Sequence, residues 1–208
     1  ADEINRAPAK TQAALLEVMQ EQQVTLDGKS MPIESPFMVL ATQNPIEQEG
    51  TYALPEAELD RFIIKINIDY PNATDEVSLA TRYAAATQPQ TSPTTSDPLD
   101  IEFAQRCCAS IEVDHRVASY AVNLVRSTRE TTLLRHGAGP RASIALIKCA
   151  RASAMLAGES YVTPDDVKQT ALAVLRHRVI RSPEIEMEGS AIDDVLTSII
   201  DKVDAPRT

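Results

Sequence analysis

The chain has 208 residues, of which 43% are hydrophobic, and its formal net charge is −10 at pH 7. A chain of this length and composition can bury a sizeable core, either as one domain or as two small ones. The acidic balance argues against a broad phosphate-binding surface, so nucleic acid is not expected as the main partner, and no apolar stretch is long enough to cross a membrane.

Aromatic residues make up only 4% of the chain, which favours packing between helices over a β-sandwich. The three cysteines, Cys107, Cys108 and Cys149, form no C-x-x-C pair. An odd number of cysteines without this spacing predicts reduced, mostly buried thiols in a cytoplasmic protein. The three histidines lack the spacing of zinc ligands, so no zinc site is expected.

An acidic pair, Asp2 and Glu3, opens the chain and has two interpretations. The pair can be a solvated cap for the helix that follows. It can also be the end of the Walker B strand of a P-loop ATPase, in which the aspartate helps to hold Mg²⁺ and the glutamate activates the attacking water. No G-x-x-x-x-G-K-[ST] phosphate loop occurs in the 208 residues, so the chain is expected to be the C-terminal part of such an enzyme.

The next segments predict a helix and a hairpin. Pro8 suits the first residue of a helix, and residues 10–21 are strong helix formers. Leu15, Val18 and Met19 fall at i, i+3 and i+4 and are expected to form one buried stripe. Residues 22–33 alternate around Asp27-Gly28, which predicts a β-hairpin.

Residues 37–42 are a short continuous apolar run, which predicts a strand buried on both faces of a parallel sheet. Asn44 follows at the carboxyl end of this strand, where ligands of open α/β sheets bind. Its amide can serve a phosphate oxygen and a water, or can simply form a turn with Pro45. Residues 47–54 are expected to form a loop, residues 55–61 a short helix and residues 62–68 the last strand.

The composition changes at Tyr70-Pro71-Asn72, which predicts a domain boundary. The proline-rich residues 88–98 are expected to form an exposed loop, and Thr163-Pro164 is a strong helix start. Only helices are expected after this loop. One helix is predicted before the loop, over residues 74–86. The helices predicted after it cover residues 101–110, 115–129, 140–157, 163–178 and 190–203.

Two arginines each have two interpretations. Arg61 can compensate the dipole at a helix C-terminus, or can be an arginine finger that reaches the nucleotide of a neighbouring subunit. Arg141 lies in the first turn of a predicted helix, where a positive charge is electrostatically misplaced. An anion in front of the helix would explain it, and so would a bond to a loop carboxylate such as Glu130.

A basic cluster, Arg176, His177, Arg178 and Arg181, lies at the end of another predicted helix. Its simplest interpretation is a solvated helix end that complements the dipole. Contact with a neighbouring subunit or a nucleotide is the alternative.

Four motifs occur in register and resemble the MoxR family of AAA+ ATPases from Walker B onward, over nearly the whole chain. The motifs are Asp2-Glu3-Ile4-Asn5-Arg6-Ala7-Pro8, Ala41-Thr42-Gln43-Asn44-Pro45, Leu54-Pro55-Glu56-Ala57-Glu58-Leu59-Asp60-Arg61-Phe62 and Gly137-Ala138-Gly139-Pro140-Arg141-Ala142. The family usually has serine where Gly139 stands. The resemblance implies an α/β remnant of a AAA+ P-loop core over residues 1–70, followed by an all-α helical lid domain over residues 71–208.

The resemblance also implies roles for single residues. Asp2 would be the acid of the Mg²⁺ and nucleotide site, Glu3 the base that activates water, and Asn44 the sensor 1 residue. Arg61 would be the finger that acts in trans, and Arg141 the sensor 2 arginine that binds nucleotide. The predicted hairpin would be the insertion before sensor 1 that is typical of this branch of the superfamily.

By the same resemblance, the parent protein would hydrolyse ATP with Mg²⁺ as a homo-oligomeric ring, a hexamer. It would remodel or mature client proteins, including clients with von Willebrand factor A domains. The chain alone, without a phosphate loop, is expected to be inactive and to bind nucleotide weakly or not at all. The competing hypothesis is a non-catalytic helical protein-interaction module.

Overall fold

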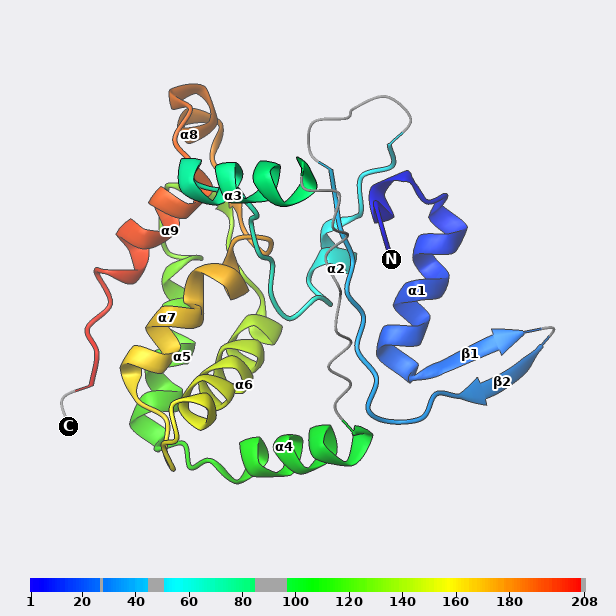
Figure 1. Cartoon of the computed structure of the whole chain (residues 1–208). Helices are drawn as coiled ribbons and strands as arrows, with labels where there is room; N and C mark the ends of the chain where they lie inside the picture. Colours follow the sequence, from blue (N-terminus) through cyan, green and yellow to red (C-terminus); the bar gives the residue numbers. More distant parts are fainter. Residues whose placement is uncertain (27, 45–50, 85–96, 207–208) are drawn as a thin grey trace.

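The computed structural model describes residues 1–26, 28–44, 51–84 and 97–206. Within these ranges the chain is mostly helical, with two small antiparallel strand pairs (Figure 1). The first part contains a 3-10 turn, η1 (Ile4–Arg6), followed by α1 (Ala9–Glu21), β1 (Gln23–Leu26), β2 (Lys29–Pro32), α2 (Glu56–Leu59) and α3 (Ala73–Ala84). The second part contains α4 (Pro98–Ser110), α5 (His115–Ser127), β3 (Leu134–His136), α6 (Pro140–Leu156), α7 (Pro164–Leu175), β4 (Ile180–Arg181), α8 (Pro183–Glu188) and α9 (Ile192–Ile200).

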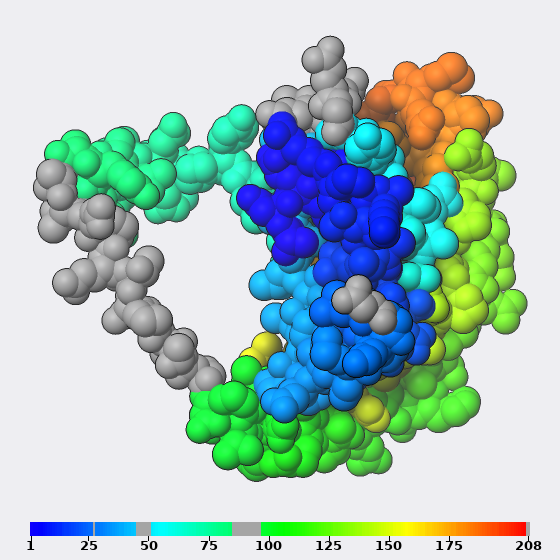
Figure 2. Space-filling view, turned by 90° about the vertical axis from the view of Figure 1, so that its right-hand side faces the viewer, coloured from blue at the N-terminus to red at the C-terminus, as the bar shows by residue number. Residues whose placement is uncertain are grey.

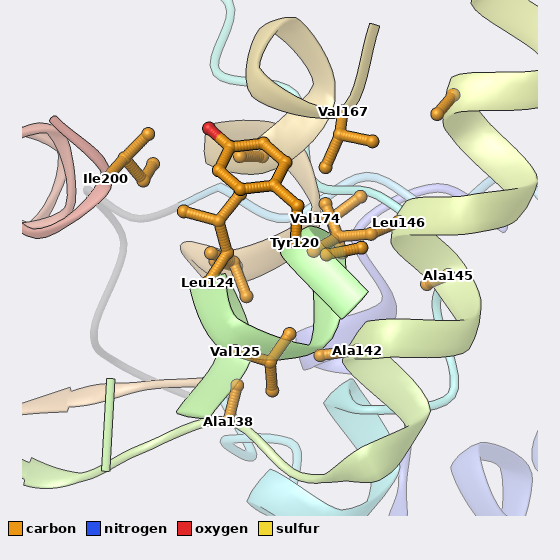
Figure 3. Packing of buried hydrophobic residues seen from close by; sticks show 14 of the residues in the cluster. Tyr120, Leu124, Val125, Ala138, Ala142, Ala145, Leu146, Val167, Val174 and Ile200 are labelled. Carbon is orange, nitrogen blue, oxygen red and sulfur yellow. The ribbon is translucent and has the colours of Figure 1, made fainter. Parts of the chain in front are cut away.

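The hydrophobic core lies in the second part, which we call the C-terminal bundle (residues 97–206). Helices α5, α6, α7 and α9 supply most of the core, and Figure 3 shows their side chains interdigitating. Leu124, Leu146, Leu175 and Leu196 are fully buried. Small residues of α6, such as Ala142 and Ala150, are fully buried as well and allow the neighbouring helices to approach closely.

The helix starts of the bundle follow their sequence signals. Thr163 caps α7 in a capping box with Asp166, and Pro164 is the first helical residue, as the sequence predicted. Asp97 and Asp114 cap α4 and α5, and each carboxylate accepts a hydrogen bond from the backbone N–H two residues on. The caps explain why most of the predicted helix starts are close to the observed ones.

The turn that leads into α6 docks on the end of α5. A side chain at Gly137 would place its Cβ 2.5 Å from the carbonyl oxygen of Thr128, so only glycine fits there. The Thr128 hydroxyl accepts a hydrogen bond from the Ala138 N–H at 2.9 Å, and Arg129 Nε donates to the Ala138 carbonyl at 2.7 Å. These contacts fix the position of the first turn of α6, which carries Arg141.

Helix α1 and the hairpin that follows it were predicted correctly as elements. The hairpin pairs β1 with β2 in an antiparallel register, and Gly28 takes the left-handed conformation at φ 77° that its turn requires. The prediction of the buried stripe on α1 was wrong. The buried residues are Gln12 and Leu16, whereas Leu15, Val18 and Met19 are only half-buried.

Both strand predictions for the first part were wrong, although the fold class holds. Neither residues 37–42 nor residues 62–68 form a strand of a sheet. Met38 is 75% exposed and Leu40 is 72% exposed, and the isoleucines of residues 62–68 are exposed as well. A buried strand needs paired strands on both sides and covering layers on both faces, and the described residues supply none of these in full.

Instead, in the described part of the chain, the backbone of residues 37–44 bonds to the start of the chain. Thr42 donates its N–H to the carbonyl of Ala1 at 3.0 Å, and Ile4 donates its N–H to the carbonyl of Thr42 at 2.9 Å. The order of these contacts makes the two segments run in parallel. This short parallel pairing is the part of the predicted α/β arrangement that the described residues contain.

The remaining differences are smaller. The strand pair β3–β4 and helix α8 were not predicted, because runs of two to six residues carry little periodicity. The predicted loops overlap residues 45–50 and 85–96, which lie outside the described residues, and Pro98 starts α4 instead of ending the loop. Helix α3 buries none of its residues, and Figure 2 shows it extending away from the rest of the molecule. The cysteines are free and half-buried, so the prediction that they are mostly buried was wrong.

None of the helices in the described part of the chain combines the length and the apolar character that spanning a bilayer requires.

Candidate functional site

The acidic pair and the segment before Asn44 lie side by side. The Thr42 hydroxyl donates to Oδ1 of Asp2 at 2.5 Å and accepts from the N–H of Glu3 at 2.8 Å. Two residues on, the Asn5 side chain donates to the carbonyl of Asn44 at 3.3 Å. The structure therefore brings together the segments that carry Asp2, Glu3 and Asn44, although they are about 40 residues apart in the sequence.

Glu3 has an unusual backbone. Its φ of 43° and ψ of 57° place a non-glycine residue in the left-handed region, which costs on the order of 1–3 kcal/mol. Such residues concentrate at functional sites, where the surroundings hold them in place. Here the hydrogen bond that the Glu3 N–H donates to the Thr42 hydroxyl does so, and Oε2 of Glu3 also pairs with Nε of Arg6 at 3.0 Å.

The two candidate arginines share a pocket of about 240 Å³ between α1, α2 and α6. Arg61, directly after α2, and Arg141, in the first turn of α6, both line it. Among the described residues, Nε of Arg61 is buried and makes no hydrogen bond. The other lining residues are Met19, Gln20, Asp60, Ile63, Ile144, Ala145, Lys148 and Arg178.

Asp60 is the acidic residue among those lining the pocket, and it contacts two arginines. Its Oδ1 accepts from Nε of Arg178 at 2.9 Å, and its Oδ2 lies 3.7 Å from Nη1 of Arg141. Glu130, the carboxylate that the sequence offered as a partner for Arg141, pairs with Arg126 instead. The side chain of Arg141 is 55% exposed, so its contact with Asp60 is a weak surface pair.

Arg178 does not belong to a solvated helix end, so that interpretation of the basic cluster was wrong. Its side chain is 3% exposed. Besides Asp60, it donates to the carbonyls of Phe62, Ile63 and Val174. Burial lowers the pKa of Arg178, and the Asp60 carboxylate acts in the opposite direction.

Two residues beside Arg178, Arg176 and His177, also bind the backbone of residues 62–65. His177 Nε2 lies 2.9 Å from the carbonyl of Phe62, and Arg176 Nη1 donates to the carbonyl of Lys65 at 3.4 Å. The N–H of Lys65 donates to the carbonyl of Ala173 at 2.8 Å. We call this set of contacts between the end of α7 and residues 60–65 the clamp, because it ties the first part of the chain to the C-terminal bundle.

His177 is neutral within the clamp. A carbonyl oxygen can only accept, so Nε2 of His177 carries the hydrogen that it donates to Phe62. Its Nδ1 is buried and has no hydrogen-bond partner among the described residues. Burial lowers the pKa of His177 to about 4, the hydrogen bond to Phe62 opposes this shift, and the positive charge of Arg178 adds to it.

The five candidate residues thus form two groups. Gln12 contacts Ile4, next to Glu3, and Met19 lines the pocket of the arginines. These two residues are seven positions apart in α1, which corresponds to about 10 Å along the helix axis. Neither Asp2, Glu3 nor Asn44 lines the arginine pocket. The acid–amide group and the arginine pocket are therefore separate places on the molecule.

Two models of known protein families match parts of the chain. A model of the ATPase family associated with various cellular activities (AAA) matches residues 1–64, and a AAA lid domain model matches residues 126–199. The uncharacterized protein YeaC of Bacillus subtilis is 41% identical over 206 residues, which cover 99% of this chain and 64% of YeaC. The chaperone MoxR1 of Mycobacterium tuberculosis is also 41% identical, over 100% of this chain and 57% of MoxR1.

The chain belongs to the MoxR family of AAA+ ATPases. A solved structure of a candidate ATPase from Cytophaga hutchinsonii superposes with a TM-score of 0.87 at 36% identity, covering 100% of this chain and 66% of that one. The fold is therefore that of a AAA+ ATPase: part of the AAA domain followed by a lid. The chain spans about three fifths of the length of YeaC and of MoxR1.

Three residues near the pocket were not singled out as site residues from the sequence. Asp60 and Lys148 carried no signal apart from their charge, since each is a common residue in a helical segment. Arg178 was placed in the wrong environment. The usable signal was the length of the basic run, because three arginines and a histidine within six residues exceed what a helix end needs.

Proposed function

We propose that this chain forms part of a Mg-ATP-hydrolysing ring of the MoxR type, which remodels or matures partner proteins. The observation that supports this most is the separation of the candidate residues into an acid–amide group and an arginine pocket. A nucleotide bound at one subunit's acid–amide group would be completed by the arginine pocket of the next subunit. Head-to-tail contacts of this kind generate rings.

The acid–amide group would activate water. Glu3, which is fixed in a left-handed conformation, would accept a proton from the attacking water as general base. Asn44 would orient that water through its amide, which can both donate and accept. Among the described residues, the Glu3 carboxylate pairs with Arg6 and does not line the arginine pocket.

The chemistry of the donor set suits Mg²⁺. Asp2 contributes carboxylate oxygens and Thr42 contributes a hydroxyl oxygen, and these two groups are hydrogen-bonded to each other. Hard divalent cations prefer oxygen ligands of this kind. When bound with ATP, Mg²⁺ would neutralise charge on the phosphates, and Asp2 would hold it.

Arg61 would act as the finger that stabilises the charge developing on a neighbour's phosphate. Its Nε is buried and lacks a hydrogen bond among the described residues, so a donor is left for a ligand. Arg141 would act as the sensor 2 arginine from the same pocket. Its exposed side chain and its weak contact with Asp60 leave it able to move to an anion.

Because the nucleotide would be shared between subunits, the active form would be a homo-oligomeric ring, a hexamer. Hydrolysis in this ring would be coupled to movement of the lid. The chaperone name of the relative MoxR1 supports client proteins as the target of this movement. Clients with von Willebrand factor A domains and a cytoplasmic location are part of the same proposal. Residues 1–70 would be the core segment and residues 71–208 the lid.

The chain on its own lacks a G-x-x-x-x-G-K-[ST] loop and is proposed to hydrolyse no ATP. A thermal-shift titration of the 208-residue chain with Mg-ATP at physiological salt should leave its melting temperature nearly unchanged, because salt screens whatever attraction the exposed arginine pocket alone has for phosphates. A clear rise would mean that the chain binds nucleotide without such a loop.

Catalytic roles are tested in the protein extended upstream of Ala1 by a phosphate-loop segment. There, Glu3→Gln should retain bound ATP while hydrolysis stops, and Arg61→Ala should reduce hydrolysis by about 10³-fold or more without preventing ATP binding. Wild-type hydrolysis by Glu3→Gln would contradict the proposed function. In that case the helical interaction module would be the better hypothesis.

A further inference from the structure

One face of α6 carries a cation that belongs to none of the family motifs. Arg141, Ile144, Ala145 and Lys148 line the arginine pocket together. Their spacing of i, i+3, i+4 and i+7 places them in one row along the helix. Lys148 is exposed and forms no hydrogen bond or ion pair with its side chain among the described residues.

The charge of the pocket is unbalanced. Its lining residues include the four cations Arg61, Arg141, Lys148 and Arg178 against the single carboxylate of Asp60, which leaves a formal charge of 4 − 1 = +3. Arg178 and Asp60 neutralise each other at 2.9 Å. The excess therefore rests on Arg61, Arg141 and Lys148, in a protein whose overall charge is −10. Cations gathered with too few counterions repel each other, and a bound anion reduces this repulsion.

The donors available in the pocket suit phosphate. Guanidinium groups bind phosphate oxygens with paired N–H groups, and a lysine ammonium adds a compact positive charge. Ile144 and Ala145 form an apolar wall between the two cations of α6, which strengthens electrostatic attraction there.

We propose that Lys148 contacts the same phosphate-bearing ligand as Arg61 and Arg141, so that the pocket is a three-cation polyphosphate site. Asp60 and Arg178 set its position but do not contact the ligand. The proposal rests on the proposed function, in which this pocket receives a neighbour's nucleotide. A polyphosphate matches the excess of three charges, whereas one carboxylate of a partner protein would balance only one of them.

The test is a calorimetric titration of the 208-residue chain with tripolyphosphate at low salt. Lys148→Ala should weaken binding about tenfold, which is the low end expected for the loss of a charge-assisted hydrogen bond. Lys148→Arg should restore most of the affinity. Lys202→Ala is the matched control, because it removes the same charge from an exposed position after α9 and should leave the affinity unchanged.

Each contrary outcome overturns the inference in a different way. If the wild-type chain does not bind tripolyphosphate, the pocket is not a polyphosphate site. If Lys148→Ala and Lys202→Ala weaken binding equally, only overall charge matters. If an acidic peptide binds more tightly than tripolyphosphate, the pocket serves a protein partner. If Arg61→Ala weakens binding and Lys148→Ala does not, Lys148 has no role, yet the proposed function stands. Failure of the proposed function is seen separately, in ATP hydrolysis by Glu3→Gln.

Discussion

The C-terminal bundle and the first 84 residues differ sharply in how they use apolar side chains. The bundle buries a continuous core, whereas the buried hydrophobic residues described in the first part are Ile4, Leu16 and Leu54. The first part is not poor in apolar residues, since residues 37–40 and 62–68 are rich in them. The difference shows that an apolar segment is buried only where another helix or sheet packs against it. The helices of the bundle do this for one another, whereas the described first part lacks such a layer.

The clamp joins the two regions. Arg178 and His177 belong to the bundle, and they hold the backbone of residues 60–65 through its carbonyl groups. Residues 60–65 are also the segment that carries Arg61 and Asp60. The position of the arginine pocket therefore depends on the well-packed region, although half of the pocket belongs to the other region.

Removing the clamp should have the largest effect on stability. Arg178→Ala leaves several carbonyls without their donor and leaves Asp60 with only its weak contact to Arg141, and breaking a buried ion pair in this way costs about 3–5 kcal/mol of unfolding free energy. Chemical denaturation gives this value, and hydrogen exchange at the Lys65 amide should become faster. Arg181→Ala is the control, because the Arg181 side chain donates a single hydrogen bond among the described residues, to the carbonyl of Ser190, and its loss should cost no more than about 1.5 kcal/mol. If the two variants lost the same unfolding free energy, the contacts of the clamp would contribute no more to stability than a single hydrogen bond.

A pair of leucines measures the contrast between the regions directly. Leu146→Ala empties a fully buried position of the bundle and should cost about 2–5 kcal/mol. Leu40→Ala makes the same chemical change at an exposed position and should change stability by about 0.5 kcal/mol or less. Equilibrium unfolding in urea compares the two variants. A large loss for Leu40→Ala would mean that residues 37–40 are covered in solution, for example by another copy of the chain.

Lowering the pH should reduce the free energy of unfolding through the titration of His177. The unfolded chain binds a proton on this ring below about pH 6.5, whereas the folded protein keeps the ring neutral down to about pH 4, because burial lowers its pKa. The unfolded state therefore binds more protons in this window. The free energy of unfolding should fall as the pH drops from 6.5 to 4, by up to about 1.4 kcal/mol per pH unit from this group.

The variant His177→Gln isolates this effect. Glutamine can still donate to Phe62, but it does not titrate. The pH dependence between 6.5 and 4 should be flatter in this variant than in the wild type, as measured by unfolding at several pH values. An unchanged slope would place the acid sensitivity elsewhere.

The smallest expected effect concerns the start of α6. A side chain at Gly139 would meet no atom within 4 Å, and its backbone is extended, as in a helix N-cap. Gly139→Ser, which introduces the residue usual in the family, should raise the unfolding free energy by a few tenths of a kcal/mol. Gly137→Ser is its counterpart two residues earlier, and it should destabilise because it clashes with Thr128. Stabilisation by both would contradict the described turn.

Much of this molecule could be predicted from local sequence signals. Caps such as Thr163 with Asp166, and the turn before Pro140, specify helix starts through contacts within a few residues, so the longer helices of the bundle were predicted, whereas the short α8 was not. The strands at residues 37–42 and 62–68 were predicted wrongly, because an apolar run shows that burial is favoured but not which element provides it. The pairing of Arg178 with Asp60 spans 118 residues and has no local signature, so the clamp could not be predicted.

The central claim is that the arginine pocket of one subunit completes the acid–amide group of another. Its most direct test mixes two inactive variants of the extended protein, Glu3→Gln and Arg61→Ala, and measures ATP hydrolysis. In a random one-to-one ring, about a quarter of the interfaces join an intact Glu3 to an intact Arg61 from the neighbour, so the account predicts that activity returns to about that fraction. If the mixture stays as inactive as its parts, Arg61 acts within its own subunit, and the account is contradicted.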